Sequence, residues 1–310
     1  MRILEQLRSR RRWSEDERIV IDQLTRVADE VIAATAAHND DAACFPTESV
    51  AALTSLGMNT IFLPEAYGGA PMSYAAYLEC VSVIAAACAS TGIIYATNFH
   101  AMGPLVEFGN EEQKERLLPR IAQGGLAALA ITEPHAGSDA TGMRTRFTPD
   151  GNDVVIDGGK RFITNGGVAD RYLLFGKWSE IESPKHAITA LIVEGDTPGL
   201  EVVRLEKKLG HRASPTAELR LNECKVPKAN ILQGPGEGLR ILLASLNRSR
   251  PSIAAHALGI ARAAFDDMVG YMNEREQSGR RVIDFQGNQF MLADLAGELA
   301  LVEGWLAYVA

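Results

Sequence analysis

The chain has 310 residues, of which 46% are hydrophobic and 23% are charged, and its formal net charge is −8. This composition is typical of a globular protein of two or three domains and excludes a disordered or fibrous chain. The acidic balance also argues against nucleic acid as a partner, and the basic cluster of Arg8, Arg10, Arg11 and Arg12 is expected to be a solvated helix end because acidic residues flank it.

Residues 1–125 are expected to form an all-helical N-terminal domain. Ser14 and Glu17 have the spacing of a capping box, in which each side chain accepts a backbone amide of the other residue. Apolar residues then recur at three- and four-residue spacings from Ile19 to Ile32, which predicts an amphipathic helix with one buried face.

The stretch from Val81 to Val106 contains no Asp, Glu, Lys or Arg and could be mistaken for a membrane span. It is rich in Ala, Ser, Thr and Gly rather than in Leu, Ile and Phe, it holds interior polar residues, and it has no basic flanks. These features favour one long buried helix of a large bundle, and we expect no membrane span.

The periodicity changes in the middle domain, residues 126–233. Short runs of β-branched and aromatic residues alternate with Gly, Pro and Ser, and Asp157-Gly158 has the sequence of a hairpin turn. Strands do not alternate with helices, so a Rossmann domain is disfavoured and an antiparallel β-barrel or sandwich is predicted. Further strands are expected within 171–178, 187–195, 200–208 and 217–226.

Helical periodicity returns in residues 234–310. Two long helical stretches are expected, over 241–277 and 284–310, and the second reaches the last residue without a helix stop signal. The predicted architecture is therefore a helical domain, a β domain and a C-terminal helical bundle that is incomplete in this chain.

Four cysteines, Cys44, Cys80, Cys88 and Cys224, show no C-x-x-C pair and no histidine at ligand spacing. We interpret them as buried thiols of a reducing compartment. The N-terminus has no continuous apolar run of the kind found in signal peptides. A cytoplasmic location is expected.

The segment "AITEPHAGSDATGMRT", residues 130–145, is the first candidate site. Its Glu133, His135 and Asp139 match no common metal-ligand spacing, and no metal site is predicted. Gly137 and Gly142 lack the Lys-Ser/Thr that a phosphate loop requires after them, and Ser138 is not in a G-x-S-x-G motif. Taken alone, the segment predicts a polar turn at the end of a strand.

Five ordered motifs give this turn a context, because together they resemble the acyl-CoA dehydrogenase family of flavoproteins along nearly the whole chain. "TEPHAGSDATGM" resembles the T-E-P-x-A-G-S-D signature of that family, and "GGKRFITNGG" resembles its G-x-K-x-x-I-T-N-G element. "KLGHRASPT" is similar to its K-x-G-x-R-x-S-x-T signature. The five matching segments are residues 132–143, 158–172, 208–241, 250–276 and 285–295.

This resemblance implies an FAD-dependent dehydrogenase in fatty acid metabolism. It would convert an acyl-CoA thioester to the trans-2-enoyl-CoA and pass electrons to an electron-transfer flavoprotein or a similar acceptor. A carboxylate would remove the α-proton while the β-hydrogen leaves as hydride, and hydrogen bonds to the thioester carbonyl would stabilise the developing negative charge. The family also implies a homodimer or homotetramer.

The site residues implied by the resemblance fall into three groups. Ile131 and Thr132 would face the polar edge of the flavin, with Phe162 beside the ring and Thr164 reaching N5. Ser138 would lie near the pantetheine of CoA, and Arg250 would face its nucleotide. The third group, which would contact the pyrophosphate and adenosine of the neighbouring subunit's FAD, is Arg275 and Gln286.

Several family features are absent from this sequence. The catalytic glutamate of a Y-E-G-T segment does not occur, and Ser249 occupies the alternative position for the base, so the catalytic residue is unknown. Ser278 replaces a usual aromatic residue, and Asn247 replaces a frequent aspartate. Three readings stay open: a dehydrogenase whose remaining C-terminal helices lie outside this sequence, a flavin-dependent monooxygenase, or a non-catalytic subunit.

Overall fold

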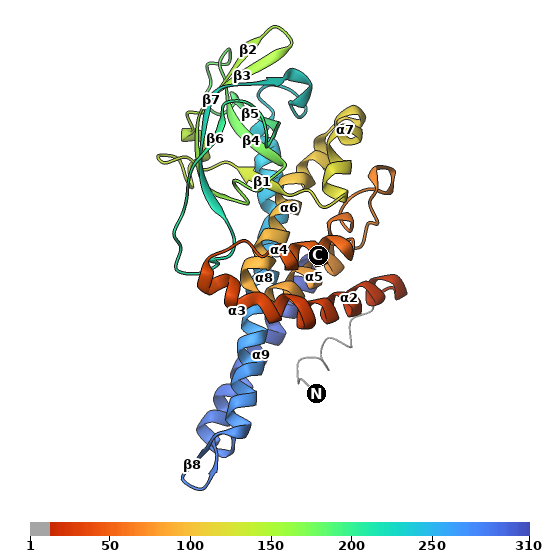
Figure 1. Cartoon of the computed structure of the whole chain (residues 1–310), viewed down its shortest axis with the longest axis vertical. Coiled ribbons are helices and arrows are strands. Elements are labelled where there is room, and N and C mark those ends of the chain that lie inside the picture. Colours follow the sequence, from red (N-terminus) through yellow and green to blue (C-terminus); the bar gives the residue numbers. More distant parts are fainter. Residues whose placement is uncertain (1–12) are drawn as a thin grey trace.

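The computed structural model describes residues 13–310, so the basic cluster of residues 8–12 lies outside the described part (Figure 1). The predicted capping box is confirmed: Ser14 Oγ accepts the Glu17 amide at 3.2 Å, and Glu17 Oε2 accepts the Ser14 amide at 3.0 Å. The helices of the N-terminal part are α2 (Glu15–Val27), α3 (Ala33–Ala42), α4 (Thr47–Ser55), α5 (Tyr74–Ala87), α6 (Ala89–Phe108) and α7 (Glu111–Ala122).

The stretch from Val81 to Val106 is buried, as predicted, but it is not one helix. Cys88 has extended backbone angles (φ −156°, ψ 113°) and separates α5 from α6. Neither Gly nor Pro marks this break in the sequence. Within residues 13–310, no helix combines the length and the apolar character that crossing a membrane requires.

The middle of the chain forms one curled seven-stranded sheet in the order β1-β4-β2-β3-β7-β6, with β5 on the other edge of β4. Most pairings are antiparallel, but β4 pairs parallel with both β1 and β2, so the predicted antiparallel barrel or sandwich is in detail a mixed sheet. The strands are β1 (Ala127–Ala130), β2 (Arg146–Asp150), β3 (Asp153–Thr164), β4 (Arg171–Trp178), β5 (Ile188–Glu194), β6 (Leu200–Leu205) and β7 (Thr216–Pro227).

The hairpin predicted at Asp157-Gly158 is wrong. β3 runs through this dipeptide, and the turn between β2 and β3 lies earlier, at Gly151 (φ 58°) and Asn152. Gly158 instead allows a close approach: a Cβ there would lie 2.7 Å from Thr145 Oγ1. Long-range pairing of β3 with β7 therefore overrides the local turn preference.

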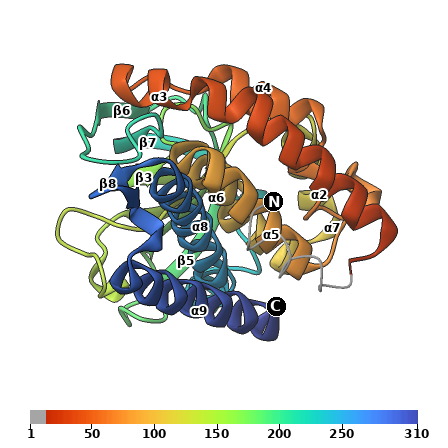
Figure 2. The same cartoon turned by 90° about the horizontal axis from the view of Figure 1, so that it is seen from below.

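The C-terminal part is an arm of two long helices (Figure 1). α8 (Gly238–Glu274) leads to the short hairpin of β8 (Glu276–Gln277) and β9 (Arg280–Arg281), and α9 (Gln286–Val309) returns along α8. Seen from below, α5, α6 and α8 lie between α2–α4 and α9 (Figure 2). The predicted order of helical, β and helical parts is confirmed.

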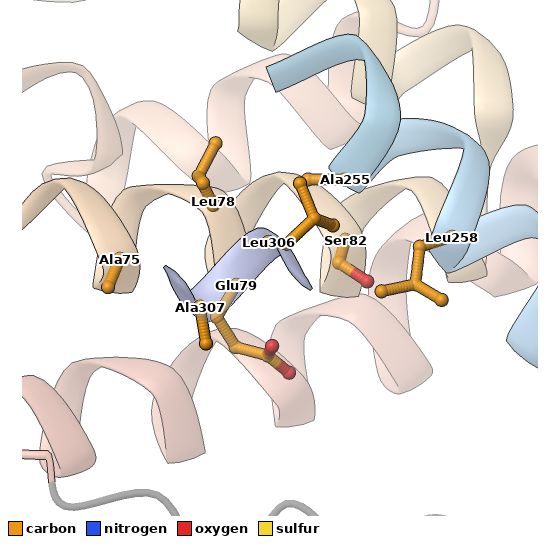
Figure 3. A pocket seen from close by; sticks show the side chains of 8 residues that line it. All are labelled: Ala75, Leu78, Glu79, Ser82, Ala255, Leu258, Leu306 and Ala307. Carbon is orange, nitrogen blue, oxygen red and sulfur yellow. The ribbon is translucent and has the colours of Figure 1, made fainter. Parts of the chain in front are cut away.

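A buried ion-pair cluster joins α9 to the other helices. Arg262 Nη2 lies 2.8 Å from Glu303 Oε2 of α9, and Arg262 Nη1 lies 3.4 Å from Glu79 Oε1 of α5. Figure 3 shows Glu79 and Ser82 of α5 beside Leu306 and Ala307 of α9, around a small cavity. α9 thus packs on α5 and α8 through both charged and apolar contacts.

Candidate functional site

The loop that follows β1 is held by a buried carboxylate. Glu133 Oε1 lies 2.7 Å from Lys160 Nζ of β3, and it also accepts the Thr145 hydroxyl at 2.6 Å and the Thr145 amide at 3.0 Å. Glu133 Oε2 accepts the Arg144 amide at 2.6 Å. The Glu133 and Lys160 side chains are 2% and 0% exposed, so solvent contributes almost nothing to this cluster.

The two charges of this pair stabilise each other. Burial lowers the pKa of Lys160 to about 8, an effect that the Glu133 carboxylate opposes. Burial disfavours the ionised form of Glu133 as well, but Lys160, Thr145 and the Arg144 amide outweigh it and lower the Glu133 pKa below its usual range. Both groups are therefore charged at pH 7, and Glu133 is engaged as an acceptor rather than available as a base.

The same cluster ties the end of β1 to β3. Lys160 Nζ also donates to the Ile131 carbonyl at 3.0 Å, and the Arg161 amide donates to the Thr132 carbonyl at 2.8 Å. The carbonyls of both predicted flavin-edge residues thus point toward β3. The Thr132 hydroxyl makes no hydrogen bond to the described part of the chain.

Phe162 has an unusual backbone for a bulky residue, with φ of 59° and 57% of its surface exposed. The register between β3 and β7 shifts between Lys160 and Ile163, so β3 carries an extra residue there. A β-bulge of this kind redirects a side chain and is common beside active sites. The Arg161 guanidinium lies 4.7 Å from the Phe162 ring centroid.

Thr164 ends β3, and Asn165 follows it with φ of 63°. Asn165 is fully buried and donates to the Ile94 carbonyl of α6 at 3.1 Å and to the Ala127 carbonyl of β1 at 2.9 Å. Asn165 Oδ1 and the Thr164 hydroxyl have no hydrogen-bond partner among the described residues. Ile131, Thr132, Phe162 and Thr164 therefore lie at one corner of the sheet, anchored to α6.

The two predicted CoA contacts lie on exposed segments. Ser138 is exposed in the loop after β1, where Asp139 accepts the Thr141 amide and hydroxyl. Arg250 is exposed on α8, and its Nη1 donates to Asn247 Oδ1 at 2.9 Å. Ser249, at the alternative position of the base, is buried and donates to the Leu246 carbonyl at 3.2 Å.

Arg275 and Gln286 are not brought to this corner. Arg275 follows the last residue of α8, Gln286 begins α9, and both are exposed at the tip of the arm near β8 (Figure 1). Ser278 and Gly279 form the turn of the tip hairpin with φ of 53° and 77°. Ser278 thus serves as a turn residue, a role that suits a small polar side chain.

Lys160 and Asn165 are functional candidates that the sequence motifs did not predict. Lys160 shares the two-residue period of the buried Val154 and Ile156, and a charge on a buried face of a strand could have indicated an ion pair. The buried role of Asn165 has no comparable signal, since its partners come from α6 and β1.

The corner fits a planar ring with a hydrogen-bonding edge. It offers an exposed aromatic side chain on a bulge and the Thr132 and Thr164 hydroxyls without partners in the described chain. These features suit the isoalloxazine of FAD, which needs hydrogen-bond donors where negative charge develops on reduction. Across the described residues, no three His, Cys, Asp or Glu side chains gather as a metal site requires.

Comparison with known proteins gives three family matches that together cover most of the chain. The N-terminal, middle and C-terminal domain models of acyl-CoA dehydrogenases match residues 14–125, 128–224 and 236–310. A probable acyl-CoA dehydrogenase, fadE25 of Mycobacterium leprae, is 40% identical over 271 residues, which are 87% of this chain and 69% of that protein.

Solved structures agree with these matches. A chain in the structure of the electron-transferring flavoprotein of Acidaminococcus fermentans superposes with a TM-score of 0.93 at 35% identity and covers 96% of this chain and 78% of its own. A glutaryl-CoA dehydrogenase of Mycobacterium smegmatis in complex with FADH2 gives 0.87 at 29% identity, covering 95% of this chain and 75% of its own. This chain is accordingly shorter than the proteins it matches.

Proposed function

The chain belongs to the acyl-CoA dehydrogenase family, and on this premise we propose that it oxidises an acyl-CoA thioester to the trans-2-enoyl-CoA with FAD as cofactor. The observation that carries the proposal is the corner of Ile131, Thr132, Phe162 and Thr164, whose geometry suits a flavin ring. Held at this corner, FAD would supply the acceptor for the β-hydrogen, which leaves the substrate as hydride. The residues of the chain bind and orient the reactants around it.

Each residue of the corner has a physical role in this proposal. The Phe162 ring, carried by the bulge of β3, would pack against the flavin ring. The Thr132 and Thr164 hydroxyls would donate to its polar edge, and both are available because neither is used within the described chain. Such donors stabilise negative charge only when they are held in place before it forms.

The substrate side is assigned to the exposed loop and to α8. Ser138 donates to the amide chain of CoA, and Arg250 supplies positive charge to its phosphates. The catalytic base stays unassigned. Glu133 is excluded by its four hydrogen bonds and its ion pair, and Ser249 has no carboxylate.

We further propose that electrons leave to an electron-transfer flavoprotein or a similar acceptor, that the protein acts in the cytoplasm, and that it forms a homodimer or homotetramer. Large apolar side chains exposed on α9, including Trp305 (67%) and Tyr308 (80%), indicate that further protein packs on this face, which a second copy or the rest of a longer chain can supply.

The test is anaerobic mixing of the purified protein with a panel of acyl-CoA thioesters, followed by the absorbance of bound flavin. Bleaching by an acyl-CoA without any pyridine nucleotide supports the proposal. Turnover that requires a reductase and oxygen would instead assign the chain to the monooxygenase alternative. A folded protein that does not bind added FAD would identify a non-catalytic subunit.

A further inference from the structure

Burying the charges of Glu133 and Lys160 costs free energy, which is unexpected for a feature that serves only the stability of the fold. Removing two charges from water carries a desolvation penalty that their attraction rarely exceeds, and apolar residues of the same volume often serve stability as well. Both side chains are almost completely buried here. The pair is thus better explained by what it holds in place.

The atoms that it holds are those next to the proposed flavin edge. Lys160 Nζ bridges Glu133 Oε1 at 2.7 Å and the Ile131 carbonyl at 3.0 Å. Lys160 is also two residues before Phe162, and the next residue, Arg161, donates its amide to the Thr132 carbonyl. The Lys160 ammonium group, together with the Arg161 amide, therefore sets the position of the β1 end relative to the bulge.

Glu133 extends the constraint to a third segment. It accepts the amides of Arg144 and Thr145 just before β2, and Thr145 packs so closely on Gly158 that no Cβ fits there. The loop that contains Ser138 is enclosed between Glu133 and Arg144, so both of its ends are fixed by this carboxylate.

We propose that Lys160 and Glu133 are a positioning pair, which fixes the Ile131–Thr132 strand end against the Phe162 bulge in the one geometry that binds flavin tightly. This inference rests on the proposed function and adds two residues that do not contact the cofactor themselves. Lys160 acts through the Ile131 carbonyl, and Glu133 acts through Lys160 and the two amides.

The experiment compares Lys160→Met with the double variant Lys160→Met/Glu133→Gln in the full chain. The single variant leaves a buried carboxylate without its ion pair and is expected to lose stability. The double variant has no buried charge at this place. The glutamine oxygen can still accept from Thr145, although its amide nitrogen cannot accept from Arg144, so its resistance to urea should recover in part. Neither variant has a donor for the Ile131 carbonyl.

The readouts are the FAD dissociation constant of the apoprotein, from quenching of flavin fluorescence, and the absorption spectrum of the bound flavin. Both variants should bind FAD at least about tenfold more weakly and show a shifted spectrum. Lys225→Met is the matched control, because Lys225 makes an exposed ion pair with Asp150 at 2.9 Å in the same sheet. It should behave as the wild type.

The outcomes are separable. A double variant with wild-type affinity and spectrum would show that the pair is only structural and would overturn the inference while the proposed function stands. If the single variant fails to fold, the double variant alone decides. A wild-type chain that does not bind FAD would overturn the proposed function and this inference with it.

Discussion

At the residue scale, two of the non-glycine residues with positive φ lie at the candidate corner. Phe162 and Asn165 both have positive φ, which costs free energy for residues other than glycine and persists only when the surroundings enforce it. Here the enforcing contacts are the pairing of β3 with β7 and the two hydrogen bonds of the Asn165 amide. The strain is evidence that the position of Phe162 serves binding rather than stability.

Thr164→Val tests the ring-facing hydroxyl. The substitution keeps the shape of the side chain and removes a hydroxyl that makes no hydrogen bond within the described chain, so the urea midpoint should change little. The spectrum of bound flavin should shift, and its reduction by acyl-CoA should slow by about tenfold, as expected for one lost hydrogen bond between neutral groups. Thr148→Val in β2 is the matched control. An unchanged spectrum and an unchanged reduction rate would contradict the role.

His100 of α6 should weaken the protein in acid. Burial, with a smaller effect of His256, lowers its pKa to about 4, whereas an unfolded histidine titrates near 6.5. Between these values the unfolded chain binds a proton that the folded chain does not. Stability should therefore fall as pH falls from 6.5 to 4, by about 3 kcal/mol from this residue.

Urea unfolding of the wild type and of His100→Leu at pH 7 and pH 4 measures this contribution. The difference in free energy of unfolding between the two proteins should change by about 3 kcal/mol across that range. The other titrating groups contribute equally to both proteins, so their effects drop out of this difference. His38→Leu, at an exposed histidine of α3, should show a much smaller change. If the free energies of unfolding of the wild type and of His100→Leu fall in parallel with pH, His100 does not contribute to the loss of stability in acid.

At the element scale, the capping box was predicted correctly from a local signal, whereas long-range strand pairing overrode another local signal. The Ser14–Glu17 capping box depends on neighbouring residues alone and formed as predicted. Asp157-Gly158 prefers a turn, but its neighbours in β7 lie more than 60 residues away in sequence and extend the strand through it. The break at Cys88 has no local signal.

The candidate corner could be predicted only in part for the same reason. The motif residues were identifiable from their order along the chain, whereas the ion pair that supports them joins residues 133 and 160, and Asn165 joins three elements. Such contacts depend on the sheet register, which the sequence pattern does not define across bulges.

Arg262 should be the residue that holds α9 in place. Its side chain is 3% exposed and lies between Glu79 and Glu303. Arg262→Met leaves the two buried carboxylates without this cation, which should lower the free energy of unfolding by about 3 kcal/mol. Hydrogen exchange should also show faster opening of α9. Arg281→Met, which removes an exposed ion pair with Asp284, should change little, and equal effects of the two variants would contradict the assignment.

At the scale of the whole molecule, the length of α8 separates the proposed cofactor contacts. The helix has 37 residues, which corresponds to about 55 Å, and its first residue packs against Thr189 of β5. His211 of the β6–β7 loop stacks on His256 of α8. Arg275 lies about 28 Å further along the helix. This separation along α8 leads us to predict that Arg275 contacts the FAD of a neighbouring copy and not the FAD beside Thr164 of its own chain.

Mixed oligomers provide the test of this arrangement. One variant carries Phe162→Ala and Thr164→Val, which alter the corner, and the other carries Arg275→Ala and Gln286→Ala, which alter the arm. Each alone should bind FAD weakly. In a pair of differently tagged chains, the intact corner of one copy meets the intact arm of the other, so that about one FAD per two chains should bind tightly. Complementation requires that the two halves of one site come from different chains. If the mixed oligomer binds FAD no more tightly than either variant alone, the arm does not complete the neighbour's site.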